Sequence, residues 1–559
     1  MRLINIASWV LLVLVNFIFL YIVVDFGLNV PYYDDFDAIG SFIFQNGLSG
    51  FWIRFVHLLD QYAEHRIGYT RLISLVYFQI FGVINFKHLI LWGLSGLLGI
   101  QIFIFLSIRK FQNAGLSMFI IGLLLLNFQY WENMMSAMTS LQNLSAPFFS
   151  LGTLFFLSRP PSKINLLATY LFLCFSVFTS GNGIILIPIG LFYLLFTKQN
   201  ISDLIRWSVL SAFLIWVYFN NYVTPPEVFG GRSNIWEALA NPVSLFQNFT
   251  LFLTSCFNGI GLSFTYCFII GTGYVVYMTF YVYDTLVLGN KKRSMWYAII
   301  FIYLLGTSFL VAVNRSESLG NMLFSRYKIY SSIAMVFIFL TSLEFFSHRL
   351  VLGFFIVFSS YFAFRSLTYV SILFNHFNEL RYSSYSYQIN HKTWVGIYPP
   401  FTTYFTNAKN ASQISRDLER TGYFRPEISM KSNEINTLDQ LNARKSCTSF
   451  SINDYTYHAQ FLFDSSPVWV DDFNCIIMKS SGELILVPLK FNFSAKDLVK
   501  KLVGKRVQIP TFTAIIPKSN VDHGDYKLIL IKSLDIGKIE KCDLSNWVIP
   551  YLETPQFHN

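Results

Sequence analysis

The chain has 559 residues, of which 54% are hydrophobic, 18% aromatic and only 13% charged. A soluble domain cannot bury that much apolar surface, so the composition excludes a soluble globular protein and predicts a polytopic α-helical membrane protein. The formal net charge of +10 does not indicate nucleic acid as a partner. The Lys and Arg residues lie mostly in short clusters between apolar segments, where they act as topology signals.

The first apolar segment follows Arg2 and has no small-residue cleavage site before Asp25, so we expect a retained anchor with a cytoplasmic N-terminus. The later basic clusters should also be cytoplasmic, so the chain must cross the membrane an even number of times between them. This condition holds if residues 72–86 and 243–262, which polar side chains interrupt, lie at the outer interface. About eleven transmembrane helices then remain, over residues 3–24, 88–108, 116–130, 144–158, 164–179, 183–197, 205–222, 266–289, 295–313, 329–346 and 350–372.

The outer loop after the first span, residues 25–87, begins with three carboxylates, Asp34, Asp35 and Asp37. Asp37 is expected to cap a helix over residues 38–59, whose apolar side chains would rest on the membrane surface. One aspartate is sufficient for a cap, so Asp34 and Asp35 are left for another role. A carboxylate beside a membrane suits proton abstraction. The alternative is that all three carboxylates only complement the helix dipole.

The same loop contains Glu64, His65 and Arg66 in succession. A basic residue on the outer side of the membrane runs counter to the charge rule, and an anionic ligand would explain it. The alternative is an interfacial turn held by ion pairs. Glu132, in the second outer loop, is either a further acidic site residue or a loop charge.

A third group lies in the outer loop between the spans at 295–313 and 329–346. It contains Arg315, Arg326, Tyr327 and Lys328. Arginine makes bidentate contacts with phosphate oxygens and a tyrosine hydroxyl adds a donor, so this loop predicts a phosphate site. The alternative is that the long basic side chains reach toward lipid headgroups. The short turn over residues 180–183, Ser-Gly-Asn-Gly, is a further place where backbone can approach a ligand.

The composition changes after about residue 375, where long apolar runs end and turn residues become frequent. Runs of β-forming residues at 473–478, 484–489, 512–516 and 526–531 predict strands. The predicted domains are a transmembrane domain over residues 1–375 and a mixed, β-rich extracytoplasmic domain over residues 376–559.

In their order and expected sidedness, these motifs resemble the GT-C superfamily of membrane glycosyltransferases, which use polyprenyl-phosphate-linked sugars. The nearest resemblance is to bacterial enzymes that modify O-antigen, the seroconverting glucosyltransferases. The likeness covers residues 1–375, and the acidic pair is Asp-Asp where the family more often has Asp-Glu. The elements that carry it are Tyr33-Asp34-Asp35-Phe36, Glu64-His65-Arg66, Phe81-Gly82-Val83, Ser180-Gly181-Asn182-Gly183 and Ser325-Arg326-Tyr327.

The resemblance implies a GT-C-like fold and an inverting glycosyltransferase. It would move a hexose, for example glucose, from a polyprenyl-phosphate donor to a surface polysaccharide or glycolipid such as lipopolysaccharide. Under this reading Asp34 is the general base, and Asp35 is its partner, which would orient the acceptor or bind a divalent cation such as Mg or Mn. The departing lipid phosphate needs positive charge. The residues expected to bind substrate are Glu64, His65, Arg66, Glu132, Arg315, Arg326, Tyr327 and Lys328.

The implied location is the bacterial inner membrane, with the N-terminus cytoplasmic and the C-terminal domain periplasmic. The implied partners are the lipid-linked sugar, the glycan acceptor and the bilayer, with no nucleic acid. One alternative enzyme is an O-antigen polymerase or ligase, which would rely on outer-loop arginines rather than on Asp34. Another alternative is a polysaccharide or lipid transporter, which should place charges at the bilayer midplane. Asp284 is the main ionisable residue within a predicted span. A non-catalytic membrane scaffold is the remaining alternative.

Overall fold

The computed structural model divides the chain into two compact units. The first, here called the helical unit, comprises residues 1–25, 48–76 and 89–366, and the second, the C-terminal unit, comprises residues 26–47, 77–88 and 367–559. The predicted boundary at residue 375 falls inside a helix, and the loop 25–87 is shared between the units. The structure describes residues 2–223, 235–290, 292–315, 319–390, 408–425, 450–454, 458–469, 475–480, 484–491, 493, 496–497, 500, 505, 507–517, 524–535 and 538–549.

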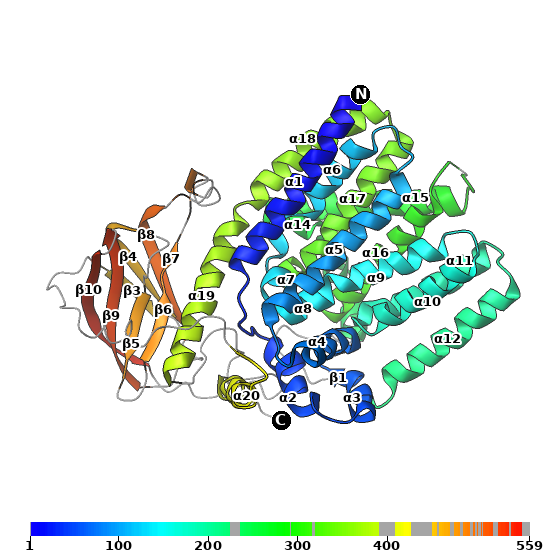
Figure 1. Cartoon of the computed structure of the whole chain (residues 1–559). Helices are drawn as coiled ribbons and strands as arrows, with labels where there is room; N and C mark the ends of the chain where they lie inside the picture. The colour runs from blue at the N-terminus through cyan, green and yellow to red at the C-terminus, as the bar shows by residue number, and fades with distance from the viewer. Residues whose placement is uncertain are drawn as a thin grey trace. The chain divides into compact units, whose positions relative to one another are not determined.

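The helical unit is a bundle of long apolar helices joined by short connections (Figure 1). A helix covers most of each of the eleven segments predicted to span the membrane. Their bounds are α1 (Arg2–Phe26), α5 (Phe86–Ile108), α6 (Ala114–Leu125), α9 (Ser145–Leu157), α10 (Lys163–Val177), α11 (Leu186–Phe196), α12 (Ile201–Phe219), α15 (Phe264–Leu286), α16 (Met295–Asn314), α17 (Lys328–Phe345) and α18 (His348–Ser366). The shorter elements of this unit are α3 (Phe51–Leu58), η2 (Phe128–Tyr130), α7 (Glu132–Met135), α8 (Ala137–Asn143), η3 (Gly181–Ile185), α13 (Ile235–Ala240), η4 (Leu319–Leu323) and η5 (Ser325–Tyr327).

Within the described residues, seven helices are long and apolar enough to cross a membrane. α6, α10 and α11 are apolar but shorter. The chain is therefore a helical membrane protein, and the number of crossings, with the side on which each loop lies, stays a prediction. Many of the large side chains that remain exposed on these helices are apolar, as expected for surfaces that face lipid.

The segment 243–262, expected at the outer interface, forms helix α14 (Pro242–Gly259). It packs against α15, α16 and α17, and its polar residues Asn248, Thr250 and Thr254 are buried. The hydroxyl of Thr254 donates to the backbone carbonyls of Thr250 and Cys267, at 3.0 and 2.9 Å. The polar interruptions in this segment therefore serve contacts between helices, since a buried hydroxyl needs a partner.

The single helix predicted over residues 38–59 forms three shorter elements: η1 (Phe36–Ser41, a π-helix), α2 (Phe42–Asn46) and α3. Gly47 follows α2, and Gly50 precedes α3 in an extended conformation, so two glycines interrupt the helix. Asp37 was expected to cap the helix. Instead, it lies inside the first turn of η1 and is not the N-cap. On α3, Trp52 is 75% exposed, which agrees with an apolar face left open to a membrane surface.

The C-terminal unit combines helix α19 (Tyr369–Asn390) and helix α20 (Ala408–Arg420) with two four-stranded antiparallel sheets. The strand orders are β10-β9-β5-β6 and β3-β4-β8-β7, and the sheets contact each other through β4 with β9 and β6 with β8. Four strands overlap the four predicted runs. The bounds are β3 (Phe450–Asp454), β4 (His458–Trp469), β5 (Cys475–Lys479), β6 (Leu484–Pro488), β7 (Lys490–Phe491), β8 (Gln508–Pro517), β9 (Gly524–Asp535) and β10 (Lys538–Ile549). The first two residues of the run 473–478 lie outside the described residues.

α19 connects to these sheets through polar contacts within the unit. The side chain of Asn375 exchanges two hydrogen bonds of 3.0 Å with the backbone of Phe491. Lys490 Nζ lies 2.6 Å from Glu379 Oε1. Ser386 Oγ accepts a hydrogen bond from the backbone N–H of Leu486. β7 is an edge strand of its sheet, and α19 covers this edge, which protects the backbone groups of β7.

Candidate functional site

The predicted group at residues 64–66 lies on a small antiparallel hairpin, β1 (Gln61–Tyr62) and β2 (His65–Arg66). Ala63, at the turn, has a positive φ of 46°, an unusual conformation for a residue with a side chain. The side chain of Gln61 bonds to the N–H and C=O of Val223, at 2.9 and 2.6 Å. The hairpin is therefore fixed to the chain that follows α12, a contact between segments more than 150 residues apart.

Arg66 completes this attachment. Its guanidinium donates to the carbonyl oxygens of Leu59, Tyr218 and Asn220, and the residue is only 7% exposed. The three donors lie in the plane of one rigid fork, which suits three fixed carbonyls. Arg66 was expected to bind phosphate, but these contacts make it a buried clamp between the hairpin and the end of α12.

Arg71, the fourth residue of α4 (Gly68–Phe81), has a similar structural role, because it also bonds to backbone carbonyls of this loop. Its Nη1 donates to the carbonyls of His57 and Asp60 at 3.1 and 2.7 Å, at the end of α3. Burial lowers the pKa of Arg71, and the carboxylate of Asp60 opposes that shift. Together, Arg66 and Arg71 hold the loop that presents Glu64 and His65.

His65 faces the turn at residues 180–183. Its Nδ1 accepts the backbone N–H of Gly181 at 3.3 Å, and its Nε2 lies 3.7 Å from Glu64 Oε1. An accepting Nδ1 assigns the hydrogen of the neutral ring to Nε2, on the side of the Glu64 carboxylate. A side chain at Gly181 would come within 3.2 Å of the imidazole and 3.1 Å of the Tyr218 hydroxyl. The backbone of this turn therefore approaches His65 closely, and its approach to a ligand stays a prediction.

Glu64 forms an ion pair with Arg315, the residue that follows α16. Glu64 Oε1 and Arg315 Nη2 are 2.8 Å apart, and both side chains keep more than a quarter of their surface exposed. The Glu64 carbonyl also accepts hydrogen bonds from the hydroxyls of Tyr218 and Tyr222, at 3.2 and 3.4 Å. Two predicted site residues, 251 positions apart, thus meet at a solvent-accessible position.

Glu132 and Arg326 form a second, looser pair. Arg326 Nε lies 3.7 Å from Glu132 Oε2, beyond ordinary hydrogen-bond length. The backbone is held more firmly, because Asn133 Nδ2 donates to the Arg326 carbonyl at 3.1 Å and Ser325 Oγ accepts from the Glu132 N–H at 3.4 Å. The connection between α16 and α17 therefore carries two arginines, each beside a glutamate. Its residues 316–318 lie outside the described part of the chain.

Tyr327 and Lys328 follow Arg326 but enter the bundle. Lys328 is 4% exposed, and its carbonyl accepts from Cys256 Sγ at 3.0 Å. The ring of Tyr327 lies 5.7 Å from that of Phe252 on α14. Of the cations predicted in this loop, Arg315 and Arg326 are therefore the two that stay partly exposed.

The predicted catalytic pair belongs to the C-terminal unit. Asp35 is fully buried, and its Oδ2 accepts the N–H of Tyr32 at 3.1 Å, so its carboxylate closes a turn of its own loop. Asp34 is 8% exposed. Tyr33, just before it, has a positive φ of 46°. A non-glycine residue held in this conformation costs energy, and such residues cluster at functional sites.

This loop packs on two helices of the same unit. The ring of Tyr32 lies edge-on to His376 of α19, with ring centroids 4.4 Å apart. Phe36 and Ala411 of α20 form a small buried cluster with Ile414. His376 was not among the predicted site residues. Its contact with Tyr32 could have been found only from the fold, because the two residues are 344 positions apart in the sequence.

The structure thus brings together Glu64, His65, Arg315 and the turn at 180–183, and separately Glu132 with Arg326, all within the helical unit. Asp34 and Asp35 lie in the other unit. The sequence analysis missed Tyr218 and Tyr222, whose hydroxyls meet Glu64; their spacing of four residues at the end of a span was the available signal.

In the described residues, no group of three or more His, Cys, Asp and Glu side chains is arranged to hold a metal ion. The divalent cation therefore stays a prediction. Comparison with protein-family models, curated proteins and solved structures finds no match.

Proposed function

We propose that this chain is an inverting glycosyltransferase that moves a hexose from a polyprenyl-phosphate donor to a glycan acceptor at the outer membrane surface. The observation that carries the proposal is the pair of partly exposed arginines on the α16–α17 connection, Arg315 and Arg326, each beside a glutamate. A phosphate oxygen can replace a carboxylate as the partner of a guanidinium, and it binds in the same bidentate geometry. The resemblance to the GT-C superfamily supplies the reaction class.

In the proposed reaction, the acceptor hydroxyl oxygen attacks the anomeric carbon of the donor sugar. A carboxylate takes the hydroxyl proton, a role that the resemblance gives to Asp34, and the bond between that carbon and the phosphate oxygen breaks. The phosphate leaves with the bonding electrons, and Arg315 and Arg326 neutralise the charge that develops on it. A single displacement inverts the configuration at the sugar carbon.

Three further residues have positioning roles in this proposal. Glu64 orients Arg315, and Arg66 holds the hairpin that carries Glu64. His65 connects the same hairpin to the turn at 180–183. Glu132 lies beside Arg326, with its Oε2 3.7 Å from Arg326 Nε, and helps to keep that arginine in place.

The test is the mass of the surface glycan in a strain that lacks the gene, complemented with variants of the chain. Wild type should restore one hexose mass, and Asp34→Asn and Arg326→Ala should not. Asp37→Asn, a carboxylate in the same loop, and Arg349→Ala, an exposed arginine at the start of α18, are the matched controls. Restoration by both Asp34→Asn and Arg326→Ala would reject the proposal.

An O-antigen polymerase or ligase is the second candidate, because the same two arginines would serve a lipid-diphosphate substrate. The two candidates differ in their need for a base. A polymerase or ligase would keep its activity in Asp34→Asn and lose it in Arg315→Ala, and it would change glycan length rather than add one hexose.

A further inference from the structure

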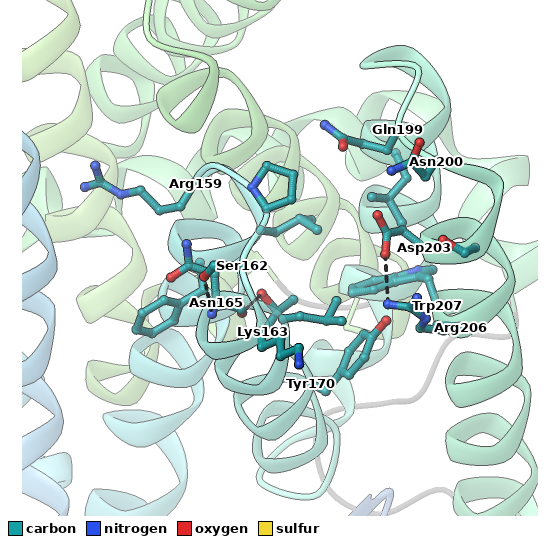
Figure 2. A pocket seen from close by; sticks show the side chains of 17 residues that line it. Arg159, Ser162, Lys163, Asn165, Tyr170, Gln199, Asn200, Asp203, Arg206 and Trp207 are labelled. Atoms are coloured by element: carbon teal, nitrogen blue, oxygen red, sulfur yellow. Dashed lines mark hydrogen bonds and ion pairs between the residues drawn. The ribbon is translucent and has the colours of Figure 1, made fainter.

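A second polar site lies at the other end of the helical unit from the hairpin. It is a cavity of about 310 Å³ between the α9–α10 connection and the α11–α12 connection. Its lining includes three basic residues, Arg159, Lys163 and Arg206, against one acidic residue, Asp203 (Figure 2). The cavity therefore carries an excess of positive charge that the proposed glycosyl transfer does not use.

The N-terminal ends of two helices line the same cavity. α10 begins at Lys163 after the cap residue Ser162, and α12 begins at Ile201 after Asn200. The backbone N–H groups at the start of a helix carry partial positive charge, which favours an anion. This field adds to that of the basic side chains, and Asp203 in the first turn of α12 offsets only part of it.

The polar groups of the cavity are incompletely used. Arg206 Nη1 pairs with Asp203 Oδ1 at 3.2 Å, but the Arg206 side chain is still about half exposed. The Tyr170 hydroxyl is buried and finds no hydrogen-bond partner among the described residues, and Figure 2 shows it directed toward the Asp203–Arg206 pair. A buried hydroxyl without a partner is costly, and a ligand oxygen would satisfy it.

The remaining walls are apolar. Phe156, Leu157, Leu166 and Leu194 line the cavity next to the charged residues. The outward faces of the surrounding helices are also apolar, with Leu167, Leu195 and Ile205 each more than half exposed. The cavity therefore lies beside apolar helix faces of the kind that contact lipid. A ligand with a phosphate at one end and a hydrocarbon chain at the other matches both parts of the lining.

α12 connects this cavity to the candidate site. Its first residues line the cavity, and its last residues accept hydrogen bonds from Arg66. A helix of 19 residues is about 28 Å long, close to the thickness of a bilayer core. The two sites therefore lie at opposite membrane faces, and the predicted topology puts the cavity on the cytoplasmic side, where acidic lipids concentrate.

We infer that this cavity binds the phosphate headgroup of an acidic membrane phospholipid, with Lys163 and Arg206 as the headgroup ligands and Tyr170 as a hydrogen-bond donor. The inference does not depend on the proposed reaction. A lipid bound there would hold the N-terminal ends of α10 and α12 together, while Arg66 holds the C-terminal end of α12 to the hairpin.

The test uses the purified full chain, stripped of lipid in a neutral detergent and titrated with phosphatidylglycerol, phosphatidylcholine of the same chain length, or inorganic phosphate. Bound lipid is counted by native mass spectrometry. We expect a preference for phosphatidylglycerol that falls about 30-fold in Lys163→Ala/Arg206→Ala. Lys110→Ala, which removes an exposed cation that does not line the cavity, should keep the preference.

Lys163→Arg/Arg206→Lys, which keeps both charges, should retain most of the preference; a loss equal to that of the alanine pair would overturn the inference. Equal binding of the two phospholipids would also overturn it, because the cations would then contribute nothing. Displacement of phosphatidylglycerol by inorganic phosphate at a comparable concentration would assign the cavity to a soluble anion instead. None of these results depends on glycan transfer, so they are distinguishable from a failure of the proposed function.

Discussion

The carboxylate of Glu64 accepts a hydrogen bond of 2.8 Å from the guanidinium of Arg315, and this contact joins the hairpin after α3 to the end of α16. Both side chains are partly exposed, so water screens the pair and its contribution to stability is small. The arginine is held in one place by its partner but remains accessible to a second anion. This combination suits a residue that binds charge transiently.

We expect Arg315→Ala to lower the rate of sugar transfer about 100-fold, because one preorganised cation at the departing phosphate is lost. The same change should alter the free energy of unfolding by less than about 1 kcal/mol. Arg315→Lys should keep part of the activity. The measurements are transfer of radiolabelled sugar from a polyprenyl-phosphate donor and the melting temperature in detergent. A large loss of stability with normal transfer per folded molecule would contradict the assignment.

The two adjacent aspartates should differ in their effects. Asp34→Asn should reduce transfer at least about 100-fold, since an amide cannot take up the hydroxyl proton. Asp35→Ala should lower stability by about 1–2 kcal/mol, because the N–H of Tyr32 loses its acceptor. Asp35→Asn keeps an oxygen acceptor and should retain most of the activity. If Asp35→Asn is as inactive as Asp34→Asn, Asp35 takes a direct part in the chemistry.

Arg66→Met should destabilise the helical unit by about 3 kcal/mol, because three carbonyl oxygens lose the N–H donors of one guanidinium group. Arg66→Lys should restore only part of the stability, since a single ammonium group cannot reproduce the planar fork. Differential scanning fluorimetry on the purified variants gives the change. If the melting temperature equals that of wild type, Arg66 does not hold the hairpin in place, and its predicted role in binding substrate is favoured instead.

Gly183 is expected to tolerate no side chain. A Cβ there would lie 2.3 Å from the backbone carbonyl of Ser176, so the turn would have to move away from α10. Gly183→Ala should cost about 1–3 kcal/mol. Gly273→Ala is the matched control, because nothing lies within 4 Å of a Cβ at that helical position. It should be neutral or stabilising by up to about 1 kcal/mol. Similar melting temperatures for the two variants would refute the packing argument.

The attachment of α19 to the sheets can be tested at Asn375. Asn375→Ala removes both hydrogen bonds to Phe491 and should weaken the attachment by about 2 kcal/mol. Ser371→Ala removes only a longer bond of 3.3 Å to the same carbonyl and should have a smaller effect. Hydrogen exchange of β7 and β8 reports the difference. Unchanged protection in Asn375→Ala would show that apolar contacts alone hold the helix in place.

The membrane class and the eleven apolar segments that form helices could be predicted from local patterns, whereas α19, which crosses the predicted domain boundary, was not predicted. Apolar runs of about 20 residues and the polar loops between them are properties of short windows, and the cost of exposing polar backbone to lipid leaves helices as the solution for such runs. The glycines were the weaker signal: α2 ends at Gly47 and α3 begins after Gly50, where the apolar pattern alone predicts one continuous helix.

The types of site residue could also be predicted, but not their contacts. Arg66 and Arg315 have the same side chain and lie in loops of the same expected side. One is buried against three carbonyls, and the other is partly exposed beside Glu64. No local pattern distinguishes them, since two of the three carbonyls that hold Arg66, those of Tyr218 and Asn220, lie 152 and 154 positions away in the sequence.

Composition and hydropathy by themselves determined that this chain is a helical membrane protein. The transfer of apolar side chains out of water depends on each short segment alone, so it can be evaluated from the sequence of that segment. The tertiary structure alone decided which charges are clamps and which stay accessible. It also brought the ends of α10 and α12 together as a basic cavity. Those outcomes depend on long-range packing, and the energy of a charge is set by the atoms that packing places around it.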